Sequence, residues 1–577
     1  MEMVRLNIDG INVEVPKGTT VLEAAKLVGI KIPTLCYLKE INEVASCRVC
    51  VVEVGQKLIA SCTLVAENDM VVKTNTESVR EVRKMVVELL LSNHKRECTT
   101  CIRSENCDLQ RIAKELNIRD IRYNGEKSNV KTDSSYSLVR DPEKCILCGR
   151  CIATCKNIQS VNAINFSQRG FDTNIGTAYE RPIEDSVCVN CGQCIMACPV
   201  GALHEKESIK DVWKAIENPN KYVVVQTAPA VRIALGEEFG MPIGSRVTGK
   251  MVTALRKLGF NKVFDTDFAA DLTIMEEGTE LLNRLSKGGV LPLMTSCCPG
   301  WVKFVEHNYP DMIDNLSTCK SPSEMQGALI KSYFADKMKI DPKDIVVVSI
   351  MPCIGKKFEG EREELSNDGM NDVDYVLTTR ELAQMIKEVA IDFVNLNDEK
   401  FDDPLGESTG AGVIFGATGG VAEAALRTIF EIVGQKEIDQ IEYTVVRGLD
   451  GIKEASVELP DGRIIKTAVV HGLGNARKVL ELIKKGEKHY DFIEVMSCPG
   501  GCVTGGGQPI VDSKIREKID IKKERAKAIY DEDKSLPIRK SHKNPCIIKI
   551  YDEFLGQPNG SLSHKLLHTH YIKREKF

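Results

Sequence analysis

Four apolar runs after residue 210 each lead directly into an unusual loop. Runs without alternating polar positions are typical of strands buried on both faces of a sheet that helices cover. In such α/β sheets, ligands collect beyond the carboxyl ends of the strands. The pattern therefore predicts an α/β region in which these loops converge on one buried pocket. The runs are YVVVQ before Thr227–Pro229, VLPLM before Thr295–Pro299, IVVVSI before Met351–Cys353 and FIEV before Met496–Cys498.

The first hundred residues show shorter elements. VRLNI and NVEV flank an Asp-Gly pair at 9–10, the two-residue turn that suits a β-hairpin. A helix is expected over 20–29, between a threonine cap and a glycine. Further on, Ser78 and Glu81 have the spacing of a capping box, which predicts the start of an apolar helix that delivers His94 at its end.

Length and charge exclude several classes of protein. At about 150 residues per domain, 577 residues correspond to roughly four domains. The 77 basic and 82 acidic residues leave a net charge of −5, which offers no broad basic face for nucleic acid. No apolar run approaches the ~20 residues that span a bilayer, and MEMVRLNIDG lacks the features of a secretory signal. We expect a cytoplasmic protein that binds neither nucleic acid nor membrane.

The 22 cysteines carry most of the chemical information. A long chain without an export signal is not expected to form disulfides, and these cysteines fall in tight groups with ligand spacing. The first group follows the predicted hairpin and helix, an arrangement that resembles a [2Fe–2S] ferredoxin domain, with a four-cysteine zinc site as the alternative. Its members are Cys36, Cys47, Cys50 and Cys62.

The second group has the pattern H-x3-C-x2-C-x5-C. Taken alone, it could hold zinc through three cysteines and one histidine. Its position between two iron–sulfur segments favours a [4Fe–4S] cluster with one histidine ligand, and a neutral imidazole tends to raise a cluster's potential. The ligands would be His94, Cys98, Cys101 and Cys107.

The strongest pattern is a C-x2-C-x2-C-x3-C run that occurs twice. This is the spacing of bacterial two-cluster ferredoxins, in which the fourth cysteine of each run binds the other cluster. The 32 residues between the runs should form an inserted loop or hairpin. The first cluster would take Cys145, Cys148, Cys151 and Cys198, and the second Cys188, Cys191, Cys194 and Cys155.

Three motifs in the loops after the apolar runs bring in a close family resemblance. TSCCPGW (295–301), MPCIGKKFE (351–359) and EVMSCPGGCVTGGGQP (494–509) are similar to the three active-site motifs of [FeFe]-hydrogenases. The order of the N-terminal cysteine groups resembles the large monomeric clostridial members, so the resemblance covers essentially the whole chain. It implies the reaction 2H⁺ + 2e⁻ ⇌ H2 at an H-cluster, a [4Fe–4S] cluster joined to a two-iron unit with CO, cyanide and a dithiolate amine.

The resemblance also implies how this cofactor is held. Cys298, Cys353, Cys498 and Cys502 would bind the [4Fe–4S] part, with Cys502 shared with the two-iron unit, and soft thiolates suit iron. Lys356 would donate a charge-assisted hydrogen bond to an iron-bound cyanide, with a surface lysine as the alternative. The other residues implied beside the cofactor, which could equally be plain core, are Ala228, Pro229, Met351, Pro352, Phe415 and Met496.

A proton route is implied in the same way. It would start at Cys297, which precedes ligand Cys298, and would use Glu277, Ser317, Glu280 and Arg284. The two glutamates and the arginine lie at positions i, i+3 and i+7 of IMEEGTELLNRL, on one face of a helix. The alternatives are a solvated charged stripe for these three residues and inert packing for the Cys297 thiol.

Some features have no role in this scheme. Cys319 and Cys546 match no motif, and we expect ordinary buried or partly exposed thiols. The run 416–420 lacks the G-x-G-x-x-G order and a Walker lysine, so helix packing is favoured over phosphate binding. In the tail, a frayed and solvated helix is favoured over metal binding for His564, His568 and His570.

The expected architecture is multidomain, with an α/β hydrogenase catalytic domain preceded by ferredoxin-like α+β domains. The predicted domains are 1–78 for [2Fe–2S], 79–125 for the histidine-ligated [4Fe–4S] cluster, 138–210 for two [4Fe–4S] clusters and 211–577 for catalysis. The cofactors would be one [2Fe–2S], three accessory [4Fe–4S] clusters and the H-cluster. The expected partners are a ferredoxin or flavodoxin as electron carrier and the maturation proteins that build the H-cluster.

Three other functions compete with this interpretation. A polyferredoxin or an NADH-dehydrogenase subunit would fit residues 1–210 but not the three late cysteine motifs. An iron–sulfur assembly protein would be expected to lack Cys297, Glu277 and Lys356, and all three are present. A hydrogen sensor usually has a signalling domain, which we do not find, but Ala230, where related enzymes often have serine, keeps this alternative open.

Overall fold

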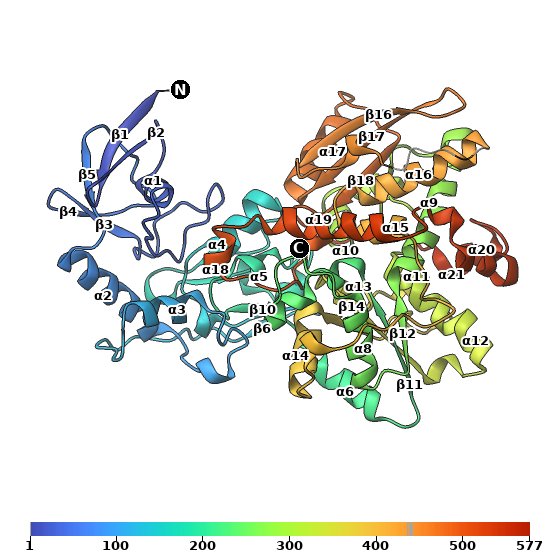
Figure 1. The fold of residues 1–577 in the computed structure, drawn as a ribbon, viewed down its shortest axis with the longest axis horizontal. Coiled ribbons are helices and arrows are strands. Elements are labelled where there is room, and N and C mark those ends of the chain that lie inside the picture. The colour runs from blue at the N-terminus through green and yellow to red at the C-terminus, as the bar shows by residue number, and fades with distance from the viewer. Residues whose placement is uncertain (1, 436, 438–441, 577) are drawn as a thin grey trace.

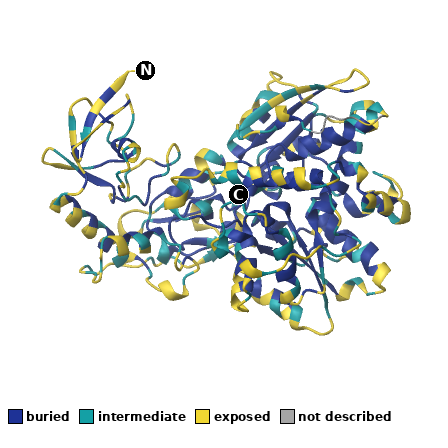
Figure 2. Cartoon of the chain, viewed as in Figure 1, coloured by how far each residue is buried: buried dark blue, intermediate teal, exposed yellow. Residues whose placement is uncertain are grey.

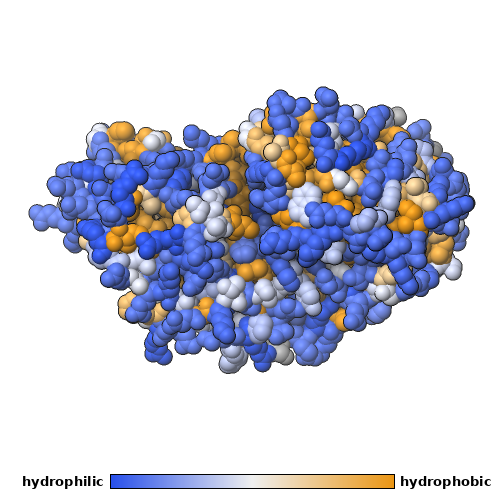
Figure 3. Space-filling model, turned by 90° about the horizontal axis from the view of Figure 1, so that it is seen from below, coloured by the Kyte–Doolittle hydropathy of each residue, from blue (hydrophilic) through white to orange (hydrophobic). Residues whose placement is uncertain are grey.

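The computed structural model describes residues 2–435, 437 and 442–576. An N-terminal part of small sheets and short helices adjoins a larger body with two four-stranded sheets (Figure 1). Buried residues concentrate in this body (Figure 2). The face in Figure 3 is mainly hydrophilic with separate hydrophobic groups. Among the described residues, no helix combines the length and apolar character needed to cross a membrane.

The N-terminal sheet contains the predicted hairpin, which is confirmed. Its first two strands pair antiparallel across the Asp-Gly turn, and the sheet order is β2-β1-β5-β3-β4. The predicted helix is also found, and the Thr20 hydroxyl caps it by accepting from the backbone N–H of Glu23. The elements are β1 (Met3–Ile8), β2 (Ile11–Pro16), α1 (Val21–Leu27), β3 (Val51–Val54), β4 (Lys57–Ala60) and β5 (Met70–Lys73).

The helix that leads to the histidine starts differently from the prediction. It is α2 (Glu77–Asn93), and Thr76, not Ser78, is its N-terminal cap. The predicted capping box of Ser78 and Glu81 is therefore wrong, because Thr76 has the extended backbone that a cap needs and its hydroxyl accepts from the Val79 N–H. His94 follows the last residue of the helix, as predicted.

The two-cluster segment is built from short elements around its cysteines. The 32 residues between the cysteine runs contain a two-stranded hairpin, as predicted. A second small sheet has the order β10-β7-β6. The elements from α2 onward are α3 (Asp108–Glu115), β6 (Asp133–Ser134), β7 (Leu138–Arg140), α4 (Arg150–Ala153), β8 (Asn165–Ser167), β9 (Asn174–Gly176), α5 (Gln193–Ala197) and β10 (Leu203–Glu205).

The four apolar runs form strands, but they are divided between two sheets. One sheet is parallel, with the order β12-β11-β14-β15, and the other has the order β13-β18-β17-β16 with an antiparallel edge strand. Only two residues of the VLPLM run pair as a strand, and the proline within the run has no N–H to donate. The strands are β11 (Tyr222–Thr227), β12 (Lys262–Asp265), β13 (Leu293–Met294), β14 (Ile345–Met351), β15 (Tyr375–Thr378), β16 (Ile452–Glu458), β17 (Ile464–His471) and β18 (Phe492–Met496).

Helices cover both sheets, and α19 runs across the body between them (Figure 1). The helices are α6 (Ile209–Glu217), α7 (Pro229–Arg232), α8 (Thr248–Leu258), α9 (Thr266–Lys287), α10 (Pro299–Asn308), α11 (Pro322–Leu329), α12 (Ala335–Met338), α13 (Gly355–Glu359), α14 (Thr379–Glu388), α15 (Gly410–Val413), α16 (Gly420–Gly434), α17 (Leu473–Lys484), α18 (Ser513–Arg516), α19 (Ile521–Ser535), α20 (Pro545–Ile550) and α21 (Ser561–Leu567).

The C-terminal helix is not frayed, and this prediction was wrong. Leu566 and Leu567 of α21 are buried in the main core. The backbone beyond the helix is held as well, because Lys320 N–H donates to the Leu567 carbonyl and Thr569 N–H donates to the Thr318 carbonyl, both at 2.8 Å. Apolar burial and strand-like pairing together fix the tail against the catalytic body.

Candidate active site

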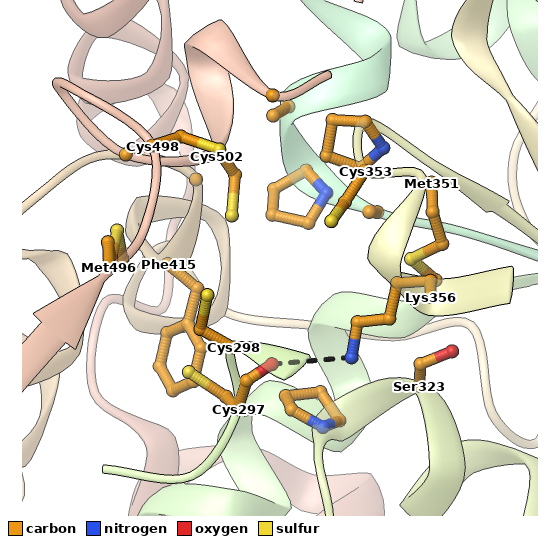
Figure 4. Close-up of a pocket in the computed structure, with 18 of the residues that line it drawn as sticks. Cys297, Cys298, Ser323, Met351, Cys353, Lys356, Phe415, Met496, Cys498 and Cys502 are labelled. Atoms are coloured by element: carbon orange, nitrogen blue, oxygen red, sulfur yellow. Dashed lines mark hydrogen bonds between the residues drawn. The ribbon is translucent and has the colours of Figure 1, made fainter. Parts of the chain in front are cut away.

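The loops after the four apolar runs line one pocket between the two sheets (Figure 4). Cys298 is the residue before α10, Cys353 follows β14, and Cys498 and Cys502 lie in the turn after β18. In Figure 4 these four sulfur atoms surround a common space. The same pocket is lined by all six residues expected beside the cofactor, Ala228, Pro229, Met351, Pro352, Phe415 and Met496.

This donor set fits an iron–sulfur cofactor. Burial, followed by repulsion from the neighbouring cysteines, raises the pKa of Cys353 to about 12 and the pKa of Cys502 well above its usual value. Buried thiolates need a metal to offset their charge. A single zinc ion with Zn–S bonds of ~2.3 Å would hold its ligands about 4 Å apart. The four pocket cysteines do not come this close together: in the described ranges, the one group of three candidate ligands within 4.8 Å is Glu280, Cys319 and His568. The wider spacing of the pocket cysteines suits a cluster larger than a single ion.

Lys356 lies inside the pocket, not on the surface. Its Nζ donates to Glu359 Oε2 at 2.6 Å and to the Cys297 carbonyl at 3.3 Å (Figure 4). Burial opposes the ammonium charge, but Glu359 raises the pKa of Lys356 above its ordinary value. The surface-lysine alternative is therefore wrong, and the pocket contains a fixed cation. Sequence reasoning missed Glu359, although it lies one helical turn after the lysine.

Glycines allow the backbone to pass close to this pocket. Gly501 has a φ of 99°, and a Cβ there would lie 2.7 Å from the Thr418 nitrogen. The Thr418 N–H donates to the Gly500 carbonyl at 3.2 Å. The run 416–420 therefore packs against the loop that contains Cys498 and Cys502. This agrees with the interpretation that its glycines serve helix packing.

Buried ionisable groups extend from Cys297 along α9. Ser317 Oγ donates to Glu280 Oε2 at 2.8 Å, and Arg284 Nη2 donates to Glu280 Oε1 at 2.6 Å. Burial, and then Glu280, raises the pKa of Glu277 to about 8. Burial, and then Glu277, raises the pKa of Cys297 well above its usual value. Glu277 is 4% exposed and Glu280 8%, so the solvated-stripe alternative is wrong for both carboxylates.

Cysteines of the two repeated runs lie beside one another in space. Cys198 joins Cys145, Cys148 and Cys151 around one enclosed pocket. Burial, followed by repulsion from Cys188, raises the pKa of Cys155 to about 11. Burial, followed by repulsion from Cys188 and Cys155, raises the pKa of Cys194 well above its usual value, so these three thiols lie near one another. Burial, followed by repulsion from Cys194 and then from Cys498 of the main pocket, raises the pKa of Cys191 well above its usual value.

The first two cysteine groups both lie against the first of these sets. Asn42 Nδ2 donates to the carbonyls of Cys36 and Cys148, at 2.7 and 3.1 Å. Arg103, in the segment of the second cysteine group, donates to the Cys198 carbonyl at 3.0 Å. The buried His94 has an Nδ1 atom without a hydrogen-bond partner in the described structure, as expected of a nitrogen that binds a metal.

The loop that carries Cys191 of the second cluster set packs against the three active-site motifs, and one glycine of each motif makes the contact. A Cβ at Gly300 would lie 3.3 Å from the Val189 carbonyl oxygen, and one at Gly355 would lie 3.2 Å from the Asn190 oxygen. A Cβ at Gly506 would lie 2.6 Å from the Cα of Gly192. These contacts place the 189–192 loop directly on the main pocket.

An ion pair that no sequence pattern indicated also joins these two parts. Arg380 donates to both carboxylate oxygens of Glu205 at 2.9 and 2.7 Å, and to the Gly506 carbonyl at 2.9 Å. Although burial opposes it, Arg380 lowers the pKa of Glu205 to about 2. The partners are 175 residues apart, so no local spacing could reveal them.

Family models match along nearly the whole chain. Residues 221–506 match the C-terminal domain of the iron-only hydrogenase large subunit, and 519–574 match the iron hydrogenase small subunit. Residues 1–77 match a 2Fe-2S cluster-binding domain, 83–122 an NADH-ubiquinone oxidoreductase-G iron–sulfur region and 144–202 a 4Fe-4S dicluster domain. The chain belongs to the iron-only, or [FeFe], hydrogenase family, with ferredoxin-like domains before its H-cluster domain.

Individual relatives agree with this family. The chain is 50% identical to the NADP-reducing hydrogenase subunit HndD of Solidesulfovibrio fructosivorans, with 100% of both chains covered. It is 43% identical to iron hydrogenase 1 of Clostridium pasteurianum, over 99% of this chain and 100% of the relative. An apo [FeFe]-hydrogenase HydA1 structure from Chlamydomonas reinhardtii is 42% identical, covers 64% of this chain and 99% of its own, and has a TM-score of 0.57.

Proposed function

We propose that this protein interconverts protons and H2 at an H-cluster held by Cys298, Cys353, Cys498 and Cys502. The observation that carries the proposal is the convergence of these thiols with Cys297 and Lys356 on one buried pocket. When bound, the cofactor would supply the iron centre at which protons and electrons combine. The Lys356 ammonium, fixed by Glu359, is suited to donate to an anionic ligand of that centre.

We propose that Cys297 passes protons between the pocket and Glu277. A thiol that burial keeps protonated can give up one proton and accept another without remaining charged. Glu277, with a pKa of about 8, can both hold and release a proton near neutral pH. Ser317, Glu280 and Arg284 continue the hydrogen-bonded series toward the end of α9.

We propose that electrons cross four accessory clusters, which form a branched route. The contacts of Asn42 and Arg103 favour the junction of the [2Fe–2S] and histidine-ligated clusters at the cluster of Cys145, Cys148, Cys151 and Cys198. The glycine contacts of the 189–192 loop favour the other [4Fe–4S] cluster as the immediate donor to the pocket.

We propose a ferredoxin or flavodoxin as the external electron carrier, with maturation proteins supplying the two-iron unit. A second candidate is electron exchange within a larger assembly that oxidises or reduces a nicotinamide nucleotide. The full-length similarity to a relative named as an NADP-reducing hydrogenase subunit favours this candidate. The two candidates share the hydrogenase reaction and differ in the group that delivers electrons.

The test compares electron donors with the purified, matured full chain under anaerobic conditions. Reduced ferredoxin should support H2 evolution, whereas NADPH without another protein should not. Reduced methyl viologen is the control for an intact catalytic centre. Activity with the dye but not with reduced ferredoxin or flavodoxin would contradict the carrier assignment and leave the hydrogenase reaction unaffected.

A further inference from the structure

A second group of buried polar side chains adjoins Glu280. Cys319 Sγ lies 3.9 Å from Glu280 Oε2. One polar atom each of Glu280, Cys319 and His568 lies within 4.8 Å of the others. The three residues come from α9, from the loop before α11 and from the C-terminal tail, and all are buried. The proton route proposed above uses neither Cys319 nor His568.

The histidine links this group to the surface. His568 Nε2 lies 3.1 Å from Glu276 Oε2, and its Nδ1 lies 2.8 Å from Thr318 Oγ1. The His568 ring stacks on the ring of His564 with centroids 4.8 Å apart, and His564 is exposed. Polar and ionisable groups therefore continue from Glu280 to solvent.

Packing of the tail fixes the position of the histidine. Cys319 and His568 pair as an isolated β-bridge, so their side chains are set by the backbone of both segments. Glu276 is held in turn by the Tyr551 hydroxyl at 2.5 Å and the Asn559 N–H at 2.7 Å. The arrangement is preorganised, because each partner has a second contact that orients it.

A metal site is the obvious alternative for glutamate, cysteine and histidine at this spacing. Glu280 already accepts from Arg284 and Ser317, and both ring nitrogens of His568 face hydrogen-bonding partners. A metal ion would have to displace these contacts and draw the ligand atoms to about 4 Å apart. A proton can instead pass along this group when the Cys319 thiol and the His568 ring, which lie within 4.8 Å, approach to hydrogen-bonding distance.

Arg284 alone is a poor terminus for a proton route. A guanidinium does not release its proton in proteins, so Arg284 can position and balance the charge of Glu280 but cannot readily relay from it. Histidine exchanges protons near neutral pH. An imidazole beside the Glu276 carboxylate can also hold a positive charge while a proton is in transit.

We propose that Glu280 is a branch point, and that Cys319 and His568 form a second proton branch that reaches solvent at His564. This inference rests on the proposed proton route as far as Glu280. In the outward direction, the Glu280 carboxyl gives a proton to Cys319 Sγ as the thiol gives its own proton to Nδ1 of His568. The Thr318 hydroxyl, which faces Nδ1, rotates to leave this nitrogen free to accept. The thiol is neutral before and after the step, and the positive charge on His568 faces Glu276.

Burial supports the neutral form of this thiol. Burial, followed by the nearby Glu280, Glu277 and Glu276 carboxylates, raises the pKa of Cys319 well above its usual value. Cys319 therefore stays protonated and relays by exchange. Inward transfer uses the same atoms in reverse order, as a reversible reaction requires.

The test is a double-mutant cycle with Cys319→Ala and His568→Gln in the matured full chain. Turnover is measured as H2 evolution from reduced methyl viologen in H2O and in D2O, and infrared spectra report the cofactor. Each substitution should lower turnover roughly three- to tenfold and increase the solvent isotope effect, because one of two branches is lost. The double variant should be no slower than the slower single variant, since the residues act in series. Cys319→Ser should recover part of the loss.

Matched controls separate this branch from structural effects. His570→Gln removes an exposed histidine two residues away and should leave turnover unchanged. Unchanged turnover in both Cys319→Ala and His568→Gln would overturn the proposal, as would additive losses with an unaltered isotope effect. If His568→Gln loses the cofactor bands, the comparison of Cys319→Ala with Cys319→Ser still tests the branch. If Cys297→Ala is inactive but the Cys319 variants are fully active, the second branch is refuted and the proposed function is unaffected.

Discussion

Glu277→Gln should make the protein more stable and at the same time nearly inactive. The Glu277 carboxyl is 4% exposed, and burial followed by repulsion from Glu280 raises its pKa from 4.5 to about 8. A glutamine amide has almost the same shape as the protonated acid but cannot release a proton. The substitution therefore removes the free-energy cost of keeping this acid protonated in the folded protein and, with it, a proton carrier.

The magnitude follows from the two pKa values. The unfolded chain releases this proton near pH 4.5, whereas the folded protein keeps it until about pH 8. Raising the pH between these values stabilises the unfolded state and so lowers the free energy of unfolding. The loss is about 3 kcal/mol at pH 7 and levels off at about 5 kcal/mol above pH 8. Glutamine does not titrate and avoids this loss. The free energy of unfolding of Glu277→Gln should therefore equal that of the parent near pH 4 and exceed it most above pH 8.

Chemical denaturation followed by tryptophan fluorescence measures this difference, because Trp301 is fully buried in the catalytic body. Parent and variant would be compared anaerobically at several pH values, with dye-driven H2 evolution on the same samples. Turnover should fall by roughly 10²–10⁴-fold, the usual contribution of a positioned proton carrier. A stability difference that does not grow with pH would refute the buried-acid reasoning. Full turnover in Glu277→Gln would remove the residue from the proton route.

Three further outcomes are expected. Cys297→Ala should keep the infrared bands of CO and cyanide but lose nearly all turnover, and Cys297→Asp should recover more than alanine because aspartate can carry a proton; loss of the bands would make Cys297 structural. Arg380→Met should destabilise the protein by about 3–5 kcal/mol in denaturation at pH 7, because it leaves the Glu205 charge buried without its partner; a change below about 1 kcal/mol would contradict this. Metal analysis should give about twenty irons per chain and no stoichiometric zinc, whereas one zinc per chain would defeat the cluster assignment at His94.

Local spacing was enough to predict the elements that carry ligands. The apolar runs before Cys298, Cys353 and Cys498 became strands, and their loops line one pocket. This worked because continuous apolar runs must be buried, and loops at the carboxyl ends of buried strands meet at the same side of a layer. The division of the strands between two sheets could not be predicted, since nothing in the runs records which strands pair with one another.

Contacts between distant segments could not be predicted. Arg380 meets Glu205, and His568 meets Glu276, only because the chain folds back over long separations. The tail was expected to fray because chain ends are usually poorly ordered, yet α21 buries Leu566 and Leu567 against the core. The capping error at Ser78 has a different origin, since Thr76 offered an equally good cap two residues earlier.

The most direct test of the central claim compares infrared spectra of the matured parent and Cys502→Ser. The account places Cys502 as the thiolate shared between the [4Fe–4S] part and the two-iron unit, and a serine oxygen is a poor match to iron–sulfur chemistry. The parent should show bands of iron-bound CO and cyanide together with H2 evolution. The variant should lack these bands while the clusters of residues 1–210 keep their absorption. Undiminished CO and cyanide bands in Cys502→Ser, or their absence from an active parent, would contradict the assignment of this pocket.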